Sequence, residues 1–352
     1  MKINLLKTNF NQTLNMIQTK SACRISFKHK ISFFGTCSIV LQVLLCVCST
    51  TTLEAQTPSD ALMMPSKNIC VLFAYDMGSF DRYWEGDYLR SNQTIATVDR
   101  NTVLPMAAIG ILDDLNFYVG LPFIRTESSE PNGGKFTGAR GLQDLGLAVK
   151  YRAIQETVLN GELTAFATAS FSTPFTNYLS DYKPYSIGAG APEFALRSIS
   201  QYQWNNGFYV RGSIAHLWRG YTEAERDYYY ADGSYYTAWM DVPNAWTYDG
   251  VVGKWLFDYS LKLEFSYTGL ASTSGDDIRA YNAAQPTNRV KFDRIGFSAQ
   301  YYFKSLKGLG VVAYHNRIID GRNMPKLSNT GFGVTYQFNP FKKTIEVEEN
   351  EQ

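Results

Sequence analysis

The most constraining feature of the sequence is an alternation of apolar and polar residues that recurs along most of the chain. Between residues 260 and 268, leucine, phenylalanine and tyrosine at odd positions alternate with serine, lysine, glutamate and threonine at even positions. The same pattern runs through residues 142–152, 294–303 and 331–338. Because successive side chains of a β-strand point to opposite faces, this period of two predicts strands with one apolar and one polar face.

The pattern predicts about twelve strands joined by connections that alternate in length. The strand ranges are 67–77, 93–112, 116–127, 141–153, 161–173, 188–204, 207–218, 240–256, 259–269, 289–303, 309–318 and 329–339. Short connections at 113–115, 154–160, 205–206, 257–258 and 304–308 alternate with long ones at 78–92, 128–140, 174–187, 219–239, 270–288 and 319–328. Short periplasmic turns and longer outer loops in alternation are typical of a transmembrane barrel.

Ionisable residues occupy the polar side of these strands, at Asp144, Lys150, Arg152, Glu162, Glu193, Arg197, Arg211, Asp249, Lys262, Glu264 and Arg294. The alternative is a soluble β-sandwich or lipocalin-like barrel, which would bury the apolar faces inside. One barrel of this size has no room for twelve such faces. Apolar faces outward and charges inward require lipid outside, where only a closed barrel satisfies every backbone polar group. We therefore predict an all-β fold, a closed antiparallel transmembrane β-barrel of about twelve strands over residues 67–341.

Composition agrees with a barrel and argues against other classes. Charged residues make up 18% of the chain and aromatic residues 15%, against about 25% charged residues in soluble domains. The mean hydropathy is nevertheless slightly polar, unlike that of a helical membrane protein. A net charge of +1 gives no reason to expect nucleic acid as a partner.

Residues 1–55 have the order of a secretory signal peptide. Basic residues between Arg24 and Lys30 precede an apolar run over 31–48, and small polar residues then lead to Ala55. We predict cleavage after Ala55. A retained signal anchor and a lipoprotein are the alternatives. Four of the five cysteines lie in this leader, so the exported part has no disulfide or thiolate metal site, and we expect no cofactor and no metal.

Residues 141–152 carry a resemblance to a known family. They read Gly-x-x-Asp-Leu-x-Leu-x-x-Lys-Tyr-Arg, which resembles a segment of the outer-membrane transporter group labelled "putative MetA-pathway of phenol degradation". Leu121–Pro122 before a long loop fits the same layout, and the resemblance extends over residues 65–341. It implies uptake of small hydrophobic or aromatic compounds, by analogy with fatty-acid and toluene channels.

The two ends of the barrel carry further expectations. Fatty-acid channels of this wider group have a long N-terminal hatch, whereas only residues 56–66 precede the first strand here. We therefore predict a short periplasmic N-terminal segment and no comparable plug. Residues 333–338 of the last strand resemble the closing-strand signal read by the barrel assembly machinery, which we predict as a partner together with outer-membrane lipid. Residues 342–352 are predicted to form a polar acidic tail, and the protein to reside in the bacterial outer membrane.

Two groups of residues are candidates for solute contact. The polar-face residues Asp144, Lys150, Arg152, Arg197, Arg211, Lys262, Glu264 and Arg294 are predicted to line the lumen, either as a selective filter or as ion pairs that hold a narrow lumen shut. The loop aromatics Trp84, Tyr228, Tyr229, Tyr230, Tyr235, Tyr236 and Trp239 form either a capture platform for a solute or a girdle at the membrane boundary.

Catalysis is the least supported function. Only His216 and His315 follow the leader, and neither shows the Ser or Asp spacing of a nucleophilic site. We predict that the chain is not an enzyme but a channel for small, hydrophobic or aromatic molecules of unidentified structure. The alternatives are a non-conducting structural or surface-interaction barrel and, third, an outer-membrane hydrolase.

Overall fold

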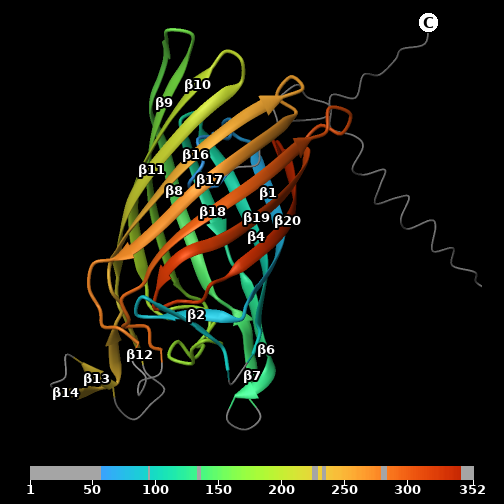
Figure 1. Cartoon of the computed structure of the whole chain (residues 1–352). Helices are drawn as coiled ribbons and strands as arrows, with labels where there is room; N and C mark the ends of the chain where they lie inside the picture. The colour runs from blue at the N-terminus through green and yellow to red at the C-terminus, as the bar shows by residue number, and fades with distance from the viewer. Residues whose placement is uncertain are drawn as a thin grey trace, which may run out of the picture. The chain divides into compact units, whose positions relative to one another are not determined.

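The structure, a computed structural model, describes residues 57–93, 96–132, 136–223, 229–231, 235–278 and 284–341. Their main feature is a single antiparallel sheet that closes on itself (Figure 1). The predicted signal peptide 1–55 and the acidic tail 342–352 lie outside the described residues.

Fourteen assigned strands build the sheet. They are β1 (Ile69–Phe80), β4 (Val98–Leu112), β5 (Leu115–Gly120), β6 (Phe123–Asn132), β7 (Phe136–Leu142), β8 (Asp144–Val158), β9 (Gly161–Pro174), β10 (Glu193–Trp204), β11 (Phe208–Arg219), β16 (Ala245–Leu256), β17 (Leu261–Ser272), β18 (Lys291–Tyr302), β19 (Leu309–Arg322) and β20 (Ser328–Phe338). Strand β1 pairs with both β20 and β4, so the ladder has no free edge.

The barrel has twelve strands because two of them are each assigned in two parts. Strands β5 and β6 both pair with β4 and are separated at Leu121–Pro122, and β7 and β8 are separated at Gln143. Proline has no backbone N–H, which interrupts the ladder locally. The interruption is bridged by hydrogen bonds from Leu121 N to Pro105 O (3.2 Å) and from Gln143 N to Pro122 O (2.9 Å). The closed twelve-strand antiparallel barrel predicted from the sequence is confirmed.

The strand ends differ from the sequence prediction mainly at the long loops. Strands β10 and β16 begin at Glu193 and Ala245, five residues later than predicted at each position. Pro192 and Pro243 lie just before these strands, and a proline cannot donate to the ladder. The residues before them belong to the long loops.

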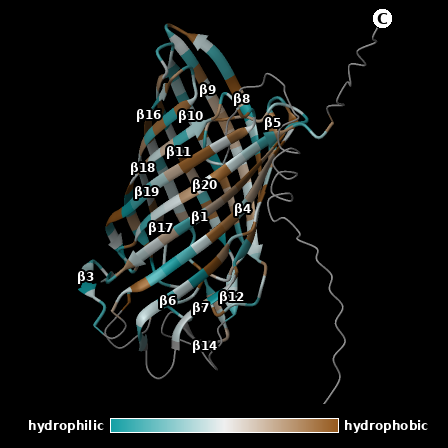
Figure 2. Ribbon diagram, turned by 90° about the vertical axis from the view of Figure 1, so that its right-hand side faces the viewer, coloured by the Kyte–Doolittle hydropathy of each residue, from teal (hydrophilic) through white to brown (hydrophobic). Residues whose placement is uncertain are grey.

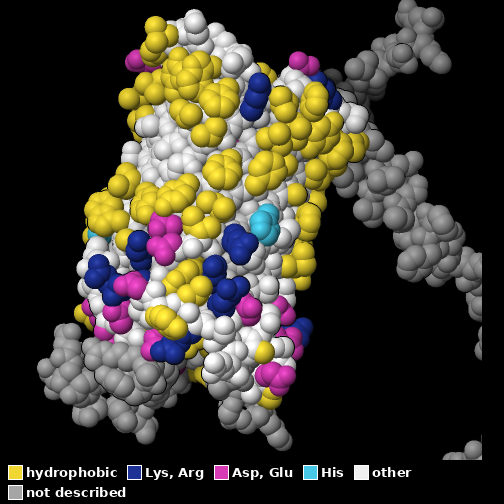
Figure 3. Space-filling view, in the orientation of Figure 1, with side chains coloured by type: hydrophobic (Ala, Val, Ile, Leu, Met, Phe, Trp, Pro, Cys, Tyr) yellow, Lys and Arg dark blue, Asp and Glu magenta, His cyan; other side chains and the backbone are white. Residues whose placement is uncertain are grey.

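Strand side chains alternate as predicted between an apolar outer face and a polar inner face. Phe265 and Phe297 are each 53% exposed on the outer surface, whereas Lys150 is fully buried inside. Apolar and polar stretches alternate along the strands in Figure 2. On the face seen in Figure 3, apolar side chains cover the half near the short turns, and charged side chains gather toward the long loops. The apolar half fits contact with lipid, and the charged half projects toward water.

Small hairpins extend the long loops. They are β2 (Arg82–Glu85) with β3 (Tyr88–Ser91), β12 (Tyr221–Glu223) with β15 (Trp239–Asp241), and β13 (Tyr229–Ala231) with β14 (Tyr235–Thr237). They lie at the lower end of the barrel in Figure 1. Within the described ranges, no helix is long and apolar enough to cross a bilayer.

A charge placed on the apolar band tests which side faces lipid. Phe73 is 59% exposed and lies between Pro105 and Val334 of the neighbouring strands. We expect Phe73→Arg to lower the free energy of unfolding by about 2–4 kcal/mol, the cost of arginine in the middle of a bilayer. Urea unfolding in lipid vesicles measures this change.

Tyr88→Arg is the matched control, because Tyr88 is also well exposed, at 67%, but lies on the β2–β3 hairpin. That variant is expected to unfold as the unsubstituted chain does. Equal stability of both variants would contradict lipid contact at Phe73.

Candidate functional site

The lumen contains a segment that precedes the first strand, residues 57–66, which we call the plug segment. Lys150 Nζ donates to Asp60 Oδ1 (2.9 Å), to Thr57 O (2.9 Å) and to Asp60 O (3.2 Å). Both side chains of this ion pair are buried. The sequence predicted a short periplasmic segment over residues 56–66 and no plug comparable to the long hatch of fatty-acid channels. The structure describes residues 57–66 inside the lumen, and their exposure to the periplasm stays a prediction. An inward lysine in a narrow lumen requires an acid, and the plug segment supplies it.

Further contacts fix the plug segment near the short-turn end of the barrel. Leu62 packs against Tyr209, Val251, Trp255 and Tyr302, all of which point inward. Pro65 passes directly over Gly110, where a Cβ atom would lie 2.1 Å from the proline carbonyl oxygen. Large aromatic side chains narrow the lumen at its short-turn end. The ten residues of the plug segment occupy the space that remains there.

The predicted lumen residues point inward, and most of them are paired. Arg211 contacts Glu264 at 3.0 Å, and Lys262 lies 3.8 Å from the same carboxylate. Arg197 contacts Asp249 at 3.3 Å. These pairs use the charges within the lumen itself, which favours the ion-pair interpretation over a row of free charges.

The remaining predicted lumen residues lie nearer the two ends. Arg152 pairs with Asp114 at the short-turn rim, at 2.5 Å. Asp144 accepts a hydrogen bond from Tyr178 Oη at 2.5 Å, toward the long-loop end. Arg294 interacts electrostatically with Asp76 and Tyr314. The structure thus distributes the eight residues along the lumen, and their role in selecting a solute stays a prediction.

The loop between β9 and β10, residues 175–192, folds into the long-loop end of the barrel, and we call it the mouth loop. Tyr185 and Ile187 are buried. Thr126 Oγ1 donates to Tyr185 O (2.6 Å), and Arg100 donates to Ile187 O (2.8 Å). The strand residues that face inward at this end therefore hold the loop inside the mouth.

The other loops at this end are tied together by Arg322 and Asn323 at the end of β19. Asn323 Oδ1 accepts hydrogen bonds from Gly86 N and Ile278 N, each at 2.9 Å. Arg322 donates to Asp87 Oδ2 at 2.7 Å and also contacts Asp277. The ion pair and hydrogen bond from Arg322 lower the pKa of the Asp277 carboxyl group. Two loops are thereby fixed to one strand end.

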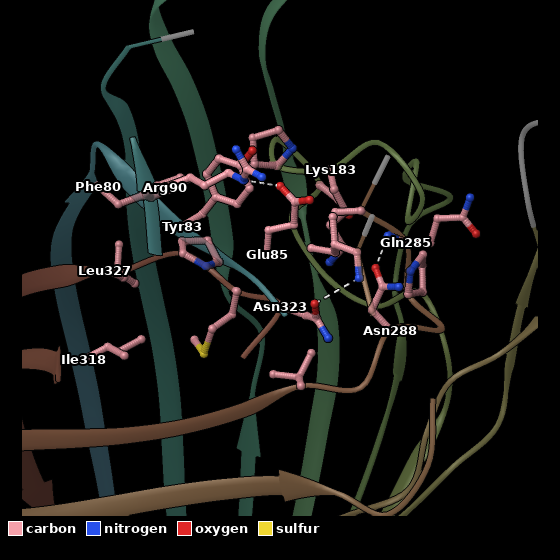
Figure 4. A pocket seen from close by; sticks show the side chains of 18 of the residues that line it. Phe80, Tyr83, Glu85, Arg90, Lys183, Gln285, Asn288, Ile318, Asn323 and Leu327 are labelled. Atoms are coloured by element: carbon pink, nitrogen blue, oxygen red, sulfur yellow. Dashed lines mark hydrogen bonds and ion pairs between the residues drawn. The ribbon is translucent and has the colours of Figure 1, made fainter. Parts of the chain in front are cut away.

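A cavity of about 1030 Å³, which we call the vestibule, lies among these loops. Its apolar lining includes Phe80, Ile318 and Leu327, and its polar lining includes Lys183, Gln285 and Asn288 (Figure 4). In Figure 4 the labelled apolar side chains lie to the left and Lys183, Gln285 and Asn288 to the right.

The vestibule lining contains more cations than carboxylates. Arg90 pairs with Glu85, and Arg219 contacts Glu193 at 2.7 Å. Arg100 donates to carbonyl oxygens of the mouth loop. Lys183 has no acidic partner among the described residues. Burial, followed by the nearby charges of Arg100 and Arg219, lowers the pKa of Lys183 to about 8.

The predicted aromatic residues occupy different environments. Trp84 is buried against Gly321 and Met324, and Lys326 lies 5.8 Å from its ring, so it anchors the β2–β3 hairpin. Trp239 is exposed on β15. Tyr228 lies outside the described residues. For Tyr229, Tyr230, Tyr235 and Tyr236 the structure describes the backbone of β13 and β14 but not the side chains.

Sequence reasoning missed Arg100, Lys183 and Arg219. Arg100 and Arg219 occupy strand positions like those of other predicted lumen residues, so their register was a usable signal. Lys183 lies in a loop, where the sequence has no periodicity to show which way a side chain points. No local signal identified it.

The two histidines outside the leader lie on different strands, β11 and β19. His216 packs between Trp218 and Trp246 on the outer surface, with ring centroids 4.4 and 4.6 Å away. His315 Nδ1 lies 2.8 Å from Thr330 Oγ1. In the described part of the chain, no cluster of His, Cys, Asp and Glu residues is suited to hold a metal ion.

Comparison with known proteins identifies the architecture. No family model and no curated protein sequence matches the chain. Among solved structures, it is similar to the COG4313 outer membrane channel from Pseudomonas putida F1, with a TM-score of 0.64 and 15% identity over 81% of this chain and 100% of that one. The chain has the fold of an outer-membrane β-barrel.

Two further structures are similar at lower scores. The translocator domain of the autotransporter NalP from Neisseria meningitidis gives a TM-score of 0.42 and 11% identity, over 87% of this chain and 95% of that one. The KdgM porin gives a TM-score of 0.37 and 8% identity, over 76% of this chain and 99% of that one.

The ion pair between Lys150 and Asp60 is expected to hold the plug segment in place. Removing the lysine leaves the carboxylate buried without a cation, which costs about 3–5 kcal/mol and favours release of the segment into water. In a Cys70→Ala background, we expect maleimide to label Leu62→Cys slowly and to label it at least about tenfold faster when Lys150→Met is added.

The control position is Leu159, which is 91% exposed at a short turn. Leu159→Cys is expected to react rapidly with or without Lys150→Met. An unchanged labelling rate at Leu62 would show that the ion pair does not retain the segment.

Proposed function

We propose that the chain is an outer-membrane channel in which small solutes enter the vestibule and pass inward when the plug segment leaves the lumen. The observation that carries this proposal is the position of the vestibule, a cavity of about 1030 Å³ at the long-loop end of the barrel. The plug segment lies at the opposite end of the same lumen. A binding chamber followed by a removable closure is an arrangement suited to passage.

The inner closure is held by side-chain and loop contacts rather than by strand pairing. They include one buried ion pair, the packing of Leu62 and Met64, a hydrogen bond from Thr168 Oγ1 to Pro58 O (3.1 Å), and hydrogen bonds from Ser66 to Asp113 Oδ1 (2.9 Å) and Ile111 O (3.2 Å). The barrel wall is independent of these contacts, because its twelve strands pair with one another. Release of the segment therefore leaves the wall intact.

The proposed solutes are small hydrophobic or aromatic molecules. Phe80, Ile318 and Leu327 give the vestibule an apolar side, and Tyr83 and Tyr88 add aromatic rings. The resemblance of residues 141–152 to the group labelled "putative MetA-pathway of phenol degradation" supports the same class. The similar solved structure from Pseudomonas putida F1 is titled an outer membrane channel.

The proposal includes the membrane environment of the barrel. Exposed apolar residues such as Phe73, Phe265 and Phe297 support outer-membrane lipid as the medium around it. Strand β20 pairs with β1 along eleven residue positions and closes the ladder. We assign to this strand the contact with the barrel assembly machinery, because its Gly-containing aromatic pattern resembles the closing-strand signal.

A non-conducting structural or surface-interaction barrel is the second candidate. The observation that favours it is the pairing of the lumen charges, such as Arg211 with Glu264, together with the plug segment. If the plug segment never leaves, the vestibule is a closed-ended surface pocket. The two functions make opposite predictions about conductance.

Planar-bilayer recordings of the refolded chain starting at residue 56 distinguish them. We expect a small conductance for this chain and a severalfold larger one when residues 57–66 are deleted, because the deletion empties the inner lumen. The Lys150→Met variant is expected to lie between them, with frequent opening events.

The Leu159→Met variant controls for substitution at an exposed short-turn position and is expected to conduct as the starting chain does. The heat-dependent mobility of a closed barrel in SDS gels verifies that each variant is folded. Folded barrels that stay silent even without residues 57–66 would exclude the channel and support the non-conducting alternative.

A further inference from the structure

We propose that the vestibule binds an anionic solute, a monocarboxylate with an apolar or aromatic body, and that the Lys183 ammonium group receives its carboxylate. Transport of such a solute rests on the proposed channel function. Binding in the vestibule does not, since the cavity and its lining exist whether or not the plug segment moves.

The first support is the absence of an acidic partner for Lys183 within the described residues. The vestibule lining includes four cationic side chains, Arg90, Arg100, Lys183 and Arg219, and one carboxylate, Glu85. Glu85 is already paired with Arg90, and Arg219 is paired with Glu193 outside the lining. Asp76 contributes an attraction to Arg100. Among the described residues, no carboxylate is left to compensate the charge of Lys183.

The second support is the rigid placement of Lys183. Its loop neighbours Tyr185 and Ile187 are buried, and Arg100 donates to the carbonyl oxygens of Ser186 (3.4 Å) and Ile187 (2.8 Å). Ser128 Oγ lies 2.9 Å from Tyr185 Oη. These contacts fix the backbone that carries the half-buried Lys183 side chain at the wall of the vestibule.

The energetic consequence favours an anion. A cation partly removed from water with no carboxylate beside it among the described residues is destabilised, and Arg100 and Arg219 add repulsion. A carboxylate in the vestibule removes this penalty and makes a charge-assisted hydrogen bond. A neutral solute of the same shape relieves nothing, and a cationic solute adds to the repulsion.

The shape of the vestibule specifies the rest of the solute. Phe80 and Leu327 belong to a packed apolar cluster with Tyr185, two residues from Lys183. Ligand pockets for small molecules are mostly apolar with a few polar groups that fix orientation. A carboxylate on Lys183 with its apolar body against Phe80 and Leu327 satisfies both parts of this lining.

Binding to the full-length refolded chain in detergent tests the proposal. The probes are benzoate and benzyl alcohol, which share a ring and differ in charge. By titration calorimetry we expect benzoate to bind more tightly than benzyl alcohol by about tenfold or more, the usual effect of a charge-assisted hydrogen bond. Lys183→Met is expected to remove this preference, and Lys183→Arg to retain it.

The control variant is Lys307→Met, which removes an exposed lysine from a short turn at the opposite end of the barrel. Its preference for benzoate is expected to be unchanged. Equal affinity of the unsubstituted chain for the two probes would overturn the proposal without requiring any variant. An undiminished benzoate preference in Lys183→Met would overturn the assignment of Lys183.

The pH dependence is an independent readout of Lys183. The groups around it are Arg100 on β4, Arg219 on β11 with Glu193 on β10, the Glu85–Arg90 pair on the hairpin, and Asp76 on β1. Lys183 is the one with a pKa lowered to about 8, so it is charged at neutral pH and loses its proton as the pH rises. Benzoate remains an anion throughout.

We therefore expect the benzoate affinity of the unsubstituted chain to fall as the pH rises through about 8. The Lys183→Arg variant should keep its affinity, because arginine stays charged. A flat pH profile in the unsubstituted chain would contradict the role of Lys183. Preferential benzoate binding by a barrel that does not conduct would confirm the anion site and reject the channel. Failure of the anion site can therefore be told apart from failure of the channel function.

Discussion

The structure depends on satisfying backbone hydrogen bonds in a medium without water. Strands that cross hydrocarbon cannot leave an edge unpaired, and the pairing of β1 with both β20 and β4 removes the last edge. Closure also decides where the side chains go. One face of every strand meets lipid, as at Phe73 and Phe265, and the other meets an enclosed lumen.

Closure then creates a second constraint inside the barrel. Charges that face a narrow lumen must be paired, and β16 and β17 supply carboxylates for Arg197 and Arg211. Lys150 receives its acid from Asp60, which precedes the first strand. The same requirement that pairs charges on neighbouring strands thus draws the plug segment into the lumen.

At the opposite end, the loops produce a chamber rather than a closure. The mouth loop fills part of the opening, and Asn323 joins two other loops at the rim. Between them remains the vestibule, with Lys183 as a cation that no described carboxylate compensates. The channel proposal and the anion proposal therefore concern two ends of one lumen, and each depends on a different lysine. Lys150 has an internal acid, whereas Lys183 is proposed to take its acid from a solute.

The sequence by itself determined the class of fold, the number of strands and the direction of most strand side chains. These follow from a local property, the period of two, which needs no knowledge of distant residues. It placed Arg211 and Glu264 in the lumen for that reason. Only the tertiary structure decided that Asp60 reaches Lys150, ninety positions away in the chain, and that Lys183 faces Arg100 and Arg219 with no carboxylate among the described residues to compensate it. Loop and terminal residues have no period that fixes their direction, so their contacts are set by the three-dimensional closure of the barrel.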